Sequence, residues 1–502
     1  EASLVTNGFS ARYGQALSGM VNVVTREPEE AWHGRIAYEG DRPFGGSLDR
    51  GLDRLALRAG GPLIGRFGLV AAADVSGRLD ADPVNPPPPD DPRDPRSAQP
   101  FPLPHNSGEV WTGAAKLVLP VTDRATIRVL GLHTEDQRLL YDPAYKYDAD
   151  FAPAERLQGD LVTGHLQYAS DPRSGAPFLV DLRVGRFVRE FLRGELESEV
   201  DYAVGAVTGS RFHFVGEDLA RAQSTTAVPV PGLRAPEMST RTPWGVPAFF
   251  LAGGSRGDLG WNRFGETRFQ LDATYGGIRH LDLYVGGEFA AQQVRTFQRI
   301  LGYLPVADTA APPAAISAFS PRTAAAYVEG QARIEDFAIT AGVRYDRFSS
   351  GSDLAGEARG SERSISPRFA VSTVLRGATV VASYGRFSQA PDYQFLVDAA
   401  FDDTTRTGRF RQGNPDLGYE NASQYELSVR VRPTEVVSLR VGAYVKRLTG
   451  LVASVPIGVN PDSTVFGNAD AGTVKGAEVL VERELRGGVG FRLAYTLQDA
   501  VA

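Results

Sequence analysis

Hydrophobic and polar residues alternate along most of the chain from His33 onward. The clearest case is 437–446, where odd positions are apolar and even positions are polar, small or tyrosine. The segments 162–168, 281–291 and 427–432 repeat this alternation. Because successive side chains of a strand point to opposite faces, each segment is predicted to form a strand with one apolar and one polar face.

The predicted strands are long, and their connections alternate in length. Many runs extend over about 10–15 residues, against about 5–6 for strands of globular proteins and about 9–11 for strands that span a membrane. Short turns alternate with long loops, which is typical of a transmembrane antiparallel β-barrel, so the predicted fold class is all-β. About seventeen strands are predicted, near 33–40, 51–60, 65–77, 108–119, 124–136, 159–170, 177–193, 261–276, 279–296, 321–333, 335–349, 362–376, 377–390, 420–432, 436–449, 473–485 and 488–500. The long loops are predicted near 78–107, 137–158, 194–260, 297–320, 391–419 and 450–472.

Aromatic residues recur near the ends of the predicted strands. Girdles at the two membrane interfaces would place them there, and ordinary packing between strands is the alternative. These residues are Trp111, Phe187, Phe191, Trp261, Phe264, Phe297, Tyr345, Phe348, Tyr384 and Phe387.

The first 30 residues differ from the rest of the chain. Gly14 and Gly19 suit turns or close approaches of the backbone. Residues 20–25 form an apolar run without clean alternation, which predicts a short strand buried on both faces. Pro28 ends this strand, since proline cannot donate to a strand ladder. The sequence therefore predicts the end of a small domain at 1–30, followed by a large one at 31–502.

Composition narrows the class of protein. The 502 residues include no cysteine, which excludes a disulfide scaffold and a zinc–thiolate site. A net charge of −7 argues against nucleic acid as a partner, because general nucleic-acid binders carry a basic patch. No apolar run approaches 18 residues, so no transmembrane helix is predicted.

Candidate chemistry is sparse, and the sequence predicts neither an enzyme nor a cofactor. No nucleophile motif or phosphate-binding loop occurs. The six histidines lack the spacing of a metal site, so no metal is predicted, and His165 and His280 are predicted to be polar residues of the barrel lumen. The acidic, proline-rich segment 80–91 is predicted to be an extracellular loop, with calcium binding as the alternative.

Four segments carry a family resemblance. Residues 8–26 resemble the end of the plug domain of TonB-dependent outer-membrane receptors, and residues 413–427 resemble a segment of the barrel in the same family. Residues 384–391 and 472–478 are similar to two further barrel segments, in family order. The matching plug positions are Arg12, Tyr13, Gly14, Gly19 and Asn22, and the matching barrel positions are Gly413, Asn414, Pro415, Leu417 and Glu420. Ser18 and Tyr419 depart from the usual residues of the family.

The resemblance implies an outer-membrane location and a set of partners. Members carry a longer plug, a TonB box and about 22 strands, so this chain is expected to be a piece with the end of the plug at 1–30 and a truncated barrel at 31–502. The implied partners are outer-membrane lipid, an extracellular solute, and a TonB-type energising complex that binds residues preceding this piece.

The long loops supply the candidate solute contacts. Aromatic side chains with arginine suit a ferric siderophore or another planar, anionic ligand through stacking and charge. Packing of the loops on themselves is the alternative. Arg12 and Asn22 are instead expected to hold the plug to the barrel wall by hydrogen bonds. The candidate solute contacts are Tyr141, Tyr145, Tyr147, Arg211, Phe212, His213, Phe214, Trp244, Phe249 and Phe250.

The resulting functional hypothesis is TonB-dependent uptake of a scarce solute, with a ferric siderophore or similar compound favoured. A receptor for adhesion or signalling, with the loop at 194–260 as its binding element, remains a second hypothesis, as does an importer of saccharides or peptides. A secreted soluble all-β binding protein is the third. These hypotheses share one architecture or one strand pattern, so the sequence does not name the solute.

Overall fold

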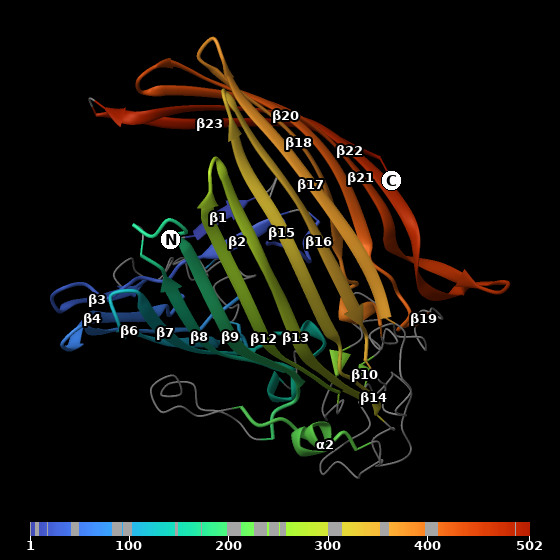
Figure 1. The fold of residues 1–502 in the computed structure, drawn as a ribbon. Coiled ribbons are helices and arrows are strands. Elements are labelled where there is room, and N and C mark those ends of the chain that lie inside the picture. Colours follow the sequence, from blue (N-terminus) through green and yellow to red (C-terminus); the bar gives the residue numbers. More distant parts are fainter. Residues whose placement is uncertain are drawn as a thin grey trace.

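The chain folds almost entirely into β-strands, most of which join one large curved sheet (Figure 1). The structure is a computed structural model. It describes residues 2–5, 10–17, 19–41, 50–82, 93, 103–145, 149–171, 173–197, 212–224, 238–239, 250–251, 258–299, 314–351, 361–396, 410–486 and 488–501.

Nineteen strands form the large sheet among the described residues. Their order follows the chain from β3 to β9 and continues from β12 to β23. Neighbours pair antiparallel, except that β19 lies parallel to β22. The strands are β3 (His33–Gly40), β4 (Asp53–Ile64), β5 (Phe67–Arg78), β6 (Gly108–Pro120), β7 (Ala125–Leu139), β8 (Ala154–Ala169), β9 (Phe178–Gly194), β12 (Leu259–Ile278), β13 (Leu281–Arg299), β14 (Ala315–Phe319), β15 (Arg322–Ile334), β16 (Phe337–Ser349), β17 (Ser361–Leu375), β18 (Ala378–Gln389), β19 (Phe410–Gln412), β20 (Glu420–Thr434), β21 (Val437–Ile457), β22 (Asn460–Arg486) and β23 (Val489–Val501).

A few short elements lie outside this sheet. The pairs β1 (Ala2–Val5) with β2 (Met20–Val23), and β10 (Met238–Ser239) with β11 (Phe250–Leu251), form two small sheets. The helical elements are α2 (Glu217–Ala222), η3 (Pro143–Tyr145), η4 (Ala149–Phe151) and η5 (Tyr393–Phe395). Within the described part of the chain, no helix has the length and apolar character needed to cross a membrane.

The sheet places apolar side chains outside and polar side chains inside. On β13, Val285 and Phe289 belong to the apolar face and are exposed, whereas Glu288 on the other face contacts residues of the lumen. Buried charged residues such as Asp272 and Arg344 lie on the inner, concave face. The alternation therefore sorts side chains as a membrane barrel requires, with apolar residues toward lipid.

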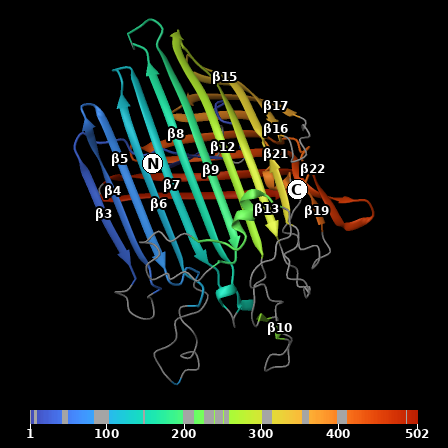
Figure 2. The same cartoon turned by 90° about the horizontal axis from the view of Figure 1, so that it is seen from below.

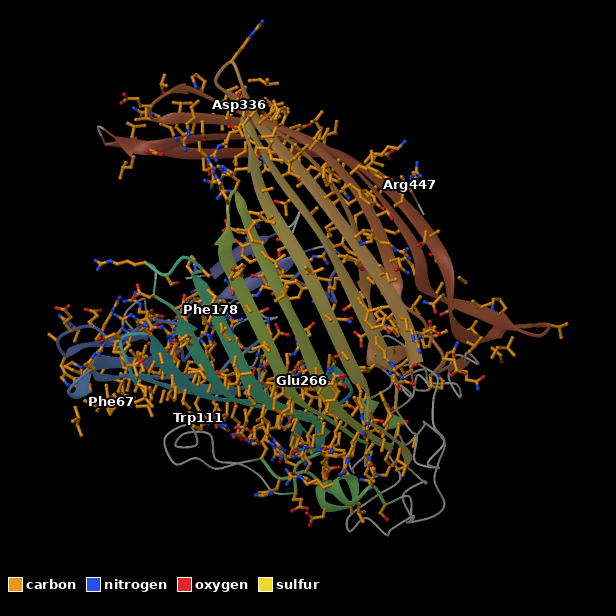
Figure 3. The ribbon with its side chains drawn as sticks, in the orientation of Figure 1. Phe67, Trp111, Phe178, Glu266, Asp336 and Arg447 are labelled. Atoms are coloured by element: carbon orange, nitrogen blue, oxygen red, sulfur yellow. The ribbon has the colours of Figure 1, made fainter. Side chains whose placement is uncertain are left out.

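The seventeen predicted strands are all present, and the short turns gather at one end of the sheet. Figure 3 labels Asp336 in the turn between β15 and β16 at that end, while Glu266 lies toward the opposite end of β12. Figure 2 shows the strands running side by side toward the end that carries the longer connections. The structure adds to the large sheet two short strands that were not predicted, β14 and β19, and β1, β10 and β11 outside it were not predicted either.

Three sequence predictions about local structure are wrong. Residues 450–472 do not form a loop but extend β21 and β22 into a hairpin that projects beyond the large sheet, which we call the wall (Figure 1). Strand β2 is not buried on both faces, since Val21 and Val23 are more than half exposed; among the described residues it pairs with β1. Trp261, Phe297, Phe348 and Phe387 are buried and cannot belong to a lipid-facing girdle.

Candidate functional site

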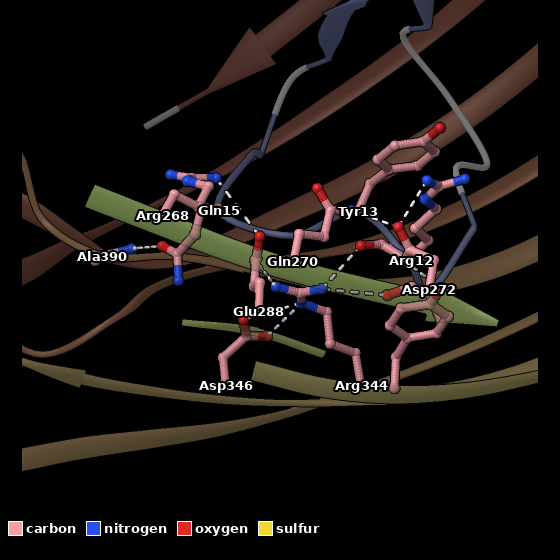
Figure 4. Close-up of polar contacts among 12 residues, drawn as sticks. Arg12, Tyr13, Gln15, Arg268, Gln270, Asp272, Glu288, Arg344, Asp346 and Ala390 are labelled. Atoms are coloured by element: carbon pink, nitrogen blue, oxygen red, sulfur yellow. Dashed lines mark hydrogen bonds and ion pairs between the residues drawn. The ribbon is translucent and has the colours of Figure 1, made fainter. Parts of the chain in front are cut away.

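A short segment near the start of the chain lies against the inner face of the wall. We call residues 10–17 the tail. It turns sharply at Ser10–Tyr13, where the Tyr13 amide donates to the Ser10 carbonyl at 3.0 Å and the Arg12 amide donates to Ser10 Oγ at 3.2 Å. Ala11 at the tip of the turn is completely buried. Figure 4 shows this turn surrounded by charged side chains of the wall.

The wall meets the tail with residues from two rows of the strand register. The first row runs Asp272–Gly286–Tyr327–Arg344 across β12, β13, β15 and β16. The second row runs Glu329–Gly342–Arg368–Gly385 across β15 to β18. Glycines lie between the large polar residues, and a Cβ at Gly342 would lie 3.1 Å from the Ala11 Cβ. The small residues therefore allow the tail to approach the wall closely.

Arg344 is the central residue of this contact. Its side chain is only 1% exposed, and it donates to the carbonyl of Arg12 at 2.9 Å. The same guanidinium pairs with Asp346 at 2.9 Å and with Glu288. A Cβ at Gly14 would overlap this guanidinium, so the glycine of the plug motif makes room for the arginine.

Two further wall residues hold the backbone of the turn. Arg368 donates to the carbonyls of Ser10 and Tyr13, the latter at 2.7 Å. Its guanidinium lies over the ring of Phe387, 4.7 Å from the centroid. Glu329 accepts from the Ala11 amide at 2.7 Å. The wall thus binds main-chain groups of the tail, which are available whatever side chains stand at these positions.

Asp272 of β12 links the tail to residues of strands β9 and β15. It pairs with Arg12 at 2.7 Å and with Arg183 at 3.3 Å, and it accepts from the Tyr327 hydroxyl at 2.6 Å. Three arginines, at positions 12, 183 and 344, therefore pair with three carboxylates, at positions 272, 288 and 346, while Arg368 and Glu329 bind the backbone of the turn with one charge of each sign. Because buried charges are costly without partners, this balance is what makes the contact stable. We call these eight residues the clamp.

Four contacts fix the rest of this region. The Lys446 ammonium donates to the Leu17 carbonyl at 2.5 Å, and the Ala390 amide donates to Gln15 Oε1 at 2.9 Å. Downstream, Glu27 pairs with Lys116 at 2.6 Å and with Arg128 at 3.2 Å. Partial burial by itself would raise the pKa of Glu27, but these two cations outweigh it and hold the pKa below its ordinary value.

A cavity of about 350 Å³ opens beside the clamp. Its lining carries four cationic side chains, His165 and a single carboxylate, Glu266. Arg183 and His165 are paired with Asp181, and Arg268 is paired with Glu266, so the charges of these lining residues are already compensated. The cavity is bounded by Thr25, Lys116, Arg128, Leu130, Leu161, Thr163, Gly164, His165, Arg183, Val184, Gly185, Phe187, Glu266, Arg268 and Gln270.

Comparison with known families decides the identity of this fold. The family model for the β-barrel of TonB dependent receptor-like proteins matches residues 133–502, well over half of the chain. The chain belongs to the TonB-dependent receptor family. The predicted all-β barrel class is confirmed, and so is the predicted outer-membrane location, since this family consists of outer-membrane receptors and transporters.

Solved structures of other TonB-dependent receptors share the fold. The FrpB iron transporter from Neisseria meningitidis matches with a TM-score of 0.64 at 13% identity over 99% of this chain and 67% of that chain. Copper transporter OprC matches with a TM-score of 0.62 at 13% identity over 99% and 66%. The siderophore receptor PirA from Pseudomonas aeruginosa matches with a TM-score of 0.60 at 13% identity over 99% and 72%. The chain thus spans about two thirds of the length of these proteins, and none of the curated proteins matches it.

The predicted plug residues of this receptor have different surroundings. Arg12 hydrogen-bonds the wall, as expected from the sequence, and Gly14 faces Arg344. Tyr13 is half-buried, with its carbonyl held by Arg368. Asn22 is exposed on β2, paired in register with Ser3, and no described hydrogen bond joins its side chain to the wall. Gly19 lies just before β2.

The predicted barrel motif braces the projecting hairpin. The side chain of Asn414 accepts from the Asp416 amide at 2.9 Å and donates to the Phe466 carbonyl at 2.8 Å. Leu417 is buried against Phe466. Glu420 accepts from the Val452 amide at 3.0 Å. Gly413 and Pro415 complete the turn between β19 and β20. The motif therefore joins that connection to β21 and β22.

The candidate solute contacts divide into four groups. Tyr141 is half-buried and His213 is exposed. Tyr145 packs on Ala152, while Phe212 and Phe214 are completely buried among residues such as Leu192 and Trp261. Phe250 pairs with Ser239 in a small sheet. Tyr147, Arg211, Trp244 and Phe249 lie outside the described residues.

Sequence analysis missed the wall side of the clamp. Alternation predicts that Glu329, Arg344 and Arg368 face the lumen, but it does not say which lumen residues meet the tail, because that depends on register between strands. The glycines opposite Glu329 and Arg368 in neighbouring strands, at positions 342 and 385, are the local signal, together with Gly286 opposite Tyr327. Among the described residues, no group of three or more metal-binding side chains occurs.

Proposed function

We propose that the protein takes up a scarce solute across the outer membrane in a TonB-dependent manner, with a ferric siderophore or similar compound as the favoured cargo. The observation that carries the proposal is the tail held inside the barrel by the clamp. Family membership supports the transport class. The favoured cargo follows the printed functions of two fold relatives, an iron transporter and a siderophore receptor. No enzymatic step is part of this proposal.

The chemistry of the clamp suits a segment that must be held and then released. Hydrogen bonds to charged groups each contribute about 1.5–3 kcal/mol, and the tail makes them through main-chain atoms along a short stretch. A pull along the chain can therefore break them one after another rather than all at once. The energising partner in this proposal is a TonB-type complex, and the second partner is an extracellular solute.

Transport assays with the full-length protein test this function. A strain lacking the gene is complemented with the protein and supplied with iron-55 bound to a panel of siderophores, in the presence and absence of the TonB-type complex. We expect accumulation of at least one ferric siderophore that requires both the protein and the complex. Copper, cobalamin and an oligosaccharide serve as alternative cargoes in the same assay.

The outcomes separate the hypotheses. Energised accumulation of a saccharide or peptide instead of iron would reassign the cargo while retaining the transport class. Binding of a macromolecular partner through the loop at 194–260, without accumulation of any solute, would support the adhesion or signalling receptor and overturn the proposal.

A further inference from the structure

Strand β12 gives a scale along the lumen, because every second side chain faces inward. Near the loop end of β12, the ring of Phe264 stacks on the ring of Tyr393. The next three inward-facing residues of β12, at positions 266, 268 and 270, line the cavity. Asp272, the next inward residue, binds Arg12 of the tail. Along β12, the residues that line the cavity therefore lie between one residue that contacts Tyr393 and one that contacts the tail.

Tyr393 belongs to a segment that bridges two parts of the wall. We call residues 390–396 the roof segment; it follows β18 and contains η5, whose first turn is capped by Asp392. Its partners lie on strands β12 to β14, and strands β15 to β17 separate these from β18 in the sheet. The Tyr393 hydroxyl donates to Gln292 Oε1. Its ring stacks on Phe264 at 5.9 Å and meets Phe319 edge-on at 6.0 Å.

The polar part of this contact persists over a wide pH range. Burial, together with the nearby carboxylate of Glu266, raises the pKa of Tyr393 well above its ordinary value. The phenol therefore remains a hydrogen-bond donor to Gln292 at physiological pH. Removing it would leave the amide oxygen of Gln292 without this donor, which is costly for a buried group.

Gln15 links the tail to the roof segment. Its side-chain oxygen accepts from the amide of Ala390, the first residue of the roof segment, at 2.9 Å (Figure 4). Gln15 is also three residues from Arg12, which pairs with Asp272 of the wall. The backbone of Gln15 is left-handed, with φ of 56°, a conformation that is uncommon for residues other than glycine. Such a residue persists only where its surroundings hold it, and it often marks a functional position.

We propose that Gln15 couples the tail to the roof segment, so that withdrawing the tail from the clamp also releases Tyr393 from β12 and β13. This coupling rests on the proposed uptake function and adds a positioning residue to it. While the tail is seated, the contacts of β12 with the tail and with Tyr393 are both in place. When the tail leaves, the Ala390 amide loses its acceptor and the roof segment loses an anchor. One pull on the tail thus loosens both contacts, which lie on either side of the cavity-lining residues of β12.

Because these 502 residues contain no cysteine, a single introduced cysteine is the only labelling site within them. In full-length protein in outer membranes, Gln394, which is exposed beside Tyr393, is replaced by cysteine and spin-labelled. The measured quantity is the ratio of mobile to immobile label. We expect Gln15→Ala to raise this ratio about 3- to 10-fold, which corresponds to loss of one hydrogen bond. Gln15→Glu keeps an acceptor and is expected to stay within twofold of the parent.

A reciprocal measurement distinguishes coupling from local loosening. Two coupled segments influence each other equally, so Tyr393→Phe is expected to mobilise a label at Ala16→Cys in the tail, although Tyr393 does not touch the tail. Correct assembly of each variant is checked by outer-membrane fractionation and by heat-modifiable migration on gels. The acceptor-preserving Gln15→Glu variant keeps the test decisive if Gln15→Ala assembles poorly.

Two outcomes would overturn the coupling. The first is an unchanged Gln394 label in Gln15→Ala while Tyr393→Phe mobilises that label, which would show that the tail does not hold the roof segment. The second is equal mobilisation by Gln15→Ala and Gln15→Glu, which would show that the acceptor is irrelevant. These measurements need no solute, so their failure is distinct from failure of the transport assays.

Discussion

At the scale of single residues, Gly14 is the position where the plug motif and the wall interlock most tightly. A Cβ at this position would overlap the guanidinium of Arg344, whose side chain is buried and engaged by Asp346 and Glu288. The arginine cannot move aside without giving up these partners. We expect Gly14→Ala to destabilise the protein by on the order of 3 kcal/mol, as is typical when a buried ion pair is broken.

Thermal and denaturant unfolding of the purified protein in detergent measure this effect. The matched control is Gly131→Ala, because a Cβ at Gly131 of β7 would meet no atom within 4 Å. The control is expected to leave stability within about 0.5 kcal/mol of the parent, as for most substitutions away from special features. Equal stability of Gly14→Ala and the control would show that Arg344 does not require the space.

Glu27 predicts how the attachment of the plug segment responds to pH. Its pKa is lowered by Lys116 and Arg128, which outweigh the effect of burial. A carboxylate with a depressed pKa in the folded state stabilises that state above its unfolded pKa, and the contribution is lost as pH falls through the folded pKa. We therefore expect the contact between residues 24–32 and the wall to loosen on acidification below the ordinary glutamate value.

Protease cleavage within residues 24–32, followed from pH 7 to pH 3, measures this loosening. Glu27→Gln removes the titrating group, so it is expected to cleave faster at neutral pH and to show a flatter pH profile. Glu29 is more exposed than Glu27 and pairs with the exposed His33 at the start of β3 rather than with Lys116 and Arg128, so Glu29→Gln is the control. An identical pH profile in Glu27→Gln and the parent would contradict the assignment.

At this scale the sequence predicted the tail but not its partners. The order of Arg12, Tyr13 and Gly14 indicated a plug segment, and the expected bond from Arg12 to the wall is present. Arg344 and Arg368 could not be singled out, because the sequence contains many lumen-facing arginines and only strand register brings these two opposite the turn. The pairing of Ala390 with Gln15 spans 375 positions and leaves no local signal.

At the scale of elements, alternation located the strands because lipid and lumen impose opposite demands on the two faces. The same rule explains why residues 450–472 were misassigned. Beyond the membrane neither face must be apolar, and Pro456, Gly458 and Pro461 resemble the residues of a loop. The structure instead continues the ladder of β21 and β22, with register shifts after Thr449 and before Ile457.

Asn468 is the residue that holds this hairpin to its neighbour. Its amide oxygen accepts from the Gly418 amide at 2.7 Å, and its amide nitrogen donates to the carbonyls of Gly418 and Gly450. We expect Asn468→Ala to loosen the hairpin, since it leaves three main-chain groups without this partner. Each lost bond contributes about 0.5–1.5 kcal/mol, so proteolysis near Gly418 should accelerate about tenfold.

Limited proteolysis of intact cells compares this variant with Val459→Ala. Val459 is fully exposed at the tip of the same hairpin and forms no part of the brace. The control is expected to be cleaved at the parental rate, with solute binding and membrane assembly unchanged. Parental resistance in Asn468→Ala would mean that burial of Leu417 and Phe466 holds the hairpin without the asparagine.

At the scale of the whole molecule, the two faces of the wall reverse the usual arrangement of a soluble protein. Leu271 and Gln270 are adjacent in β12 but face opposite sides. Leu271 is half exposed on the outer face, whereas Gln270 lines the cavity and donates to Asp272 at 2.9 Å. This contrast argues against the hypothesis of a secreted soluble protein, because apolar rows exposed on successive strands would be unfavourable in water.

Lysine at these two positions tests the arrangement directly. Leu271→Lys places a charge toward lipid, which costs about 2–4 kcal/mol near the bilayer midplane, whereas Gln270→Lys places the same charge beside Asp272 in the lumen. We expect Leu271→Lys to reduce the amount of heat-modifiable protein in the outer membrane severalfold and Gln270→Lys to leave it near the parental level. Because the two variants place a lysine of the same charge on the same strand at adjacent positions, they differ mainly in the face to which that lysine points. The opposite ranking would mean that β12 presents its other face to lipid, and the register that brings Asp272 to Arg12 would then be wrong as well.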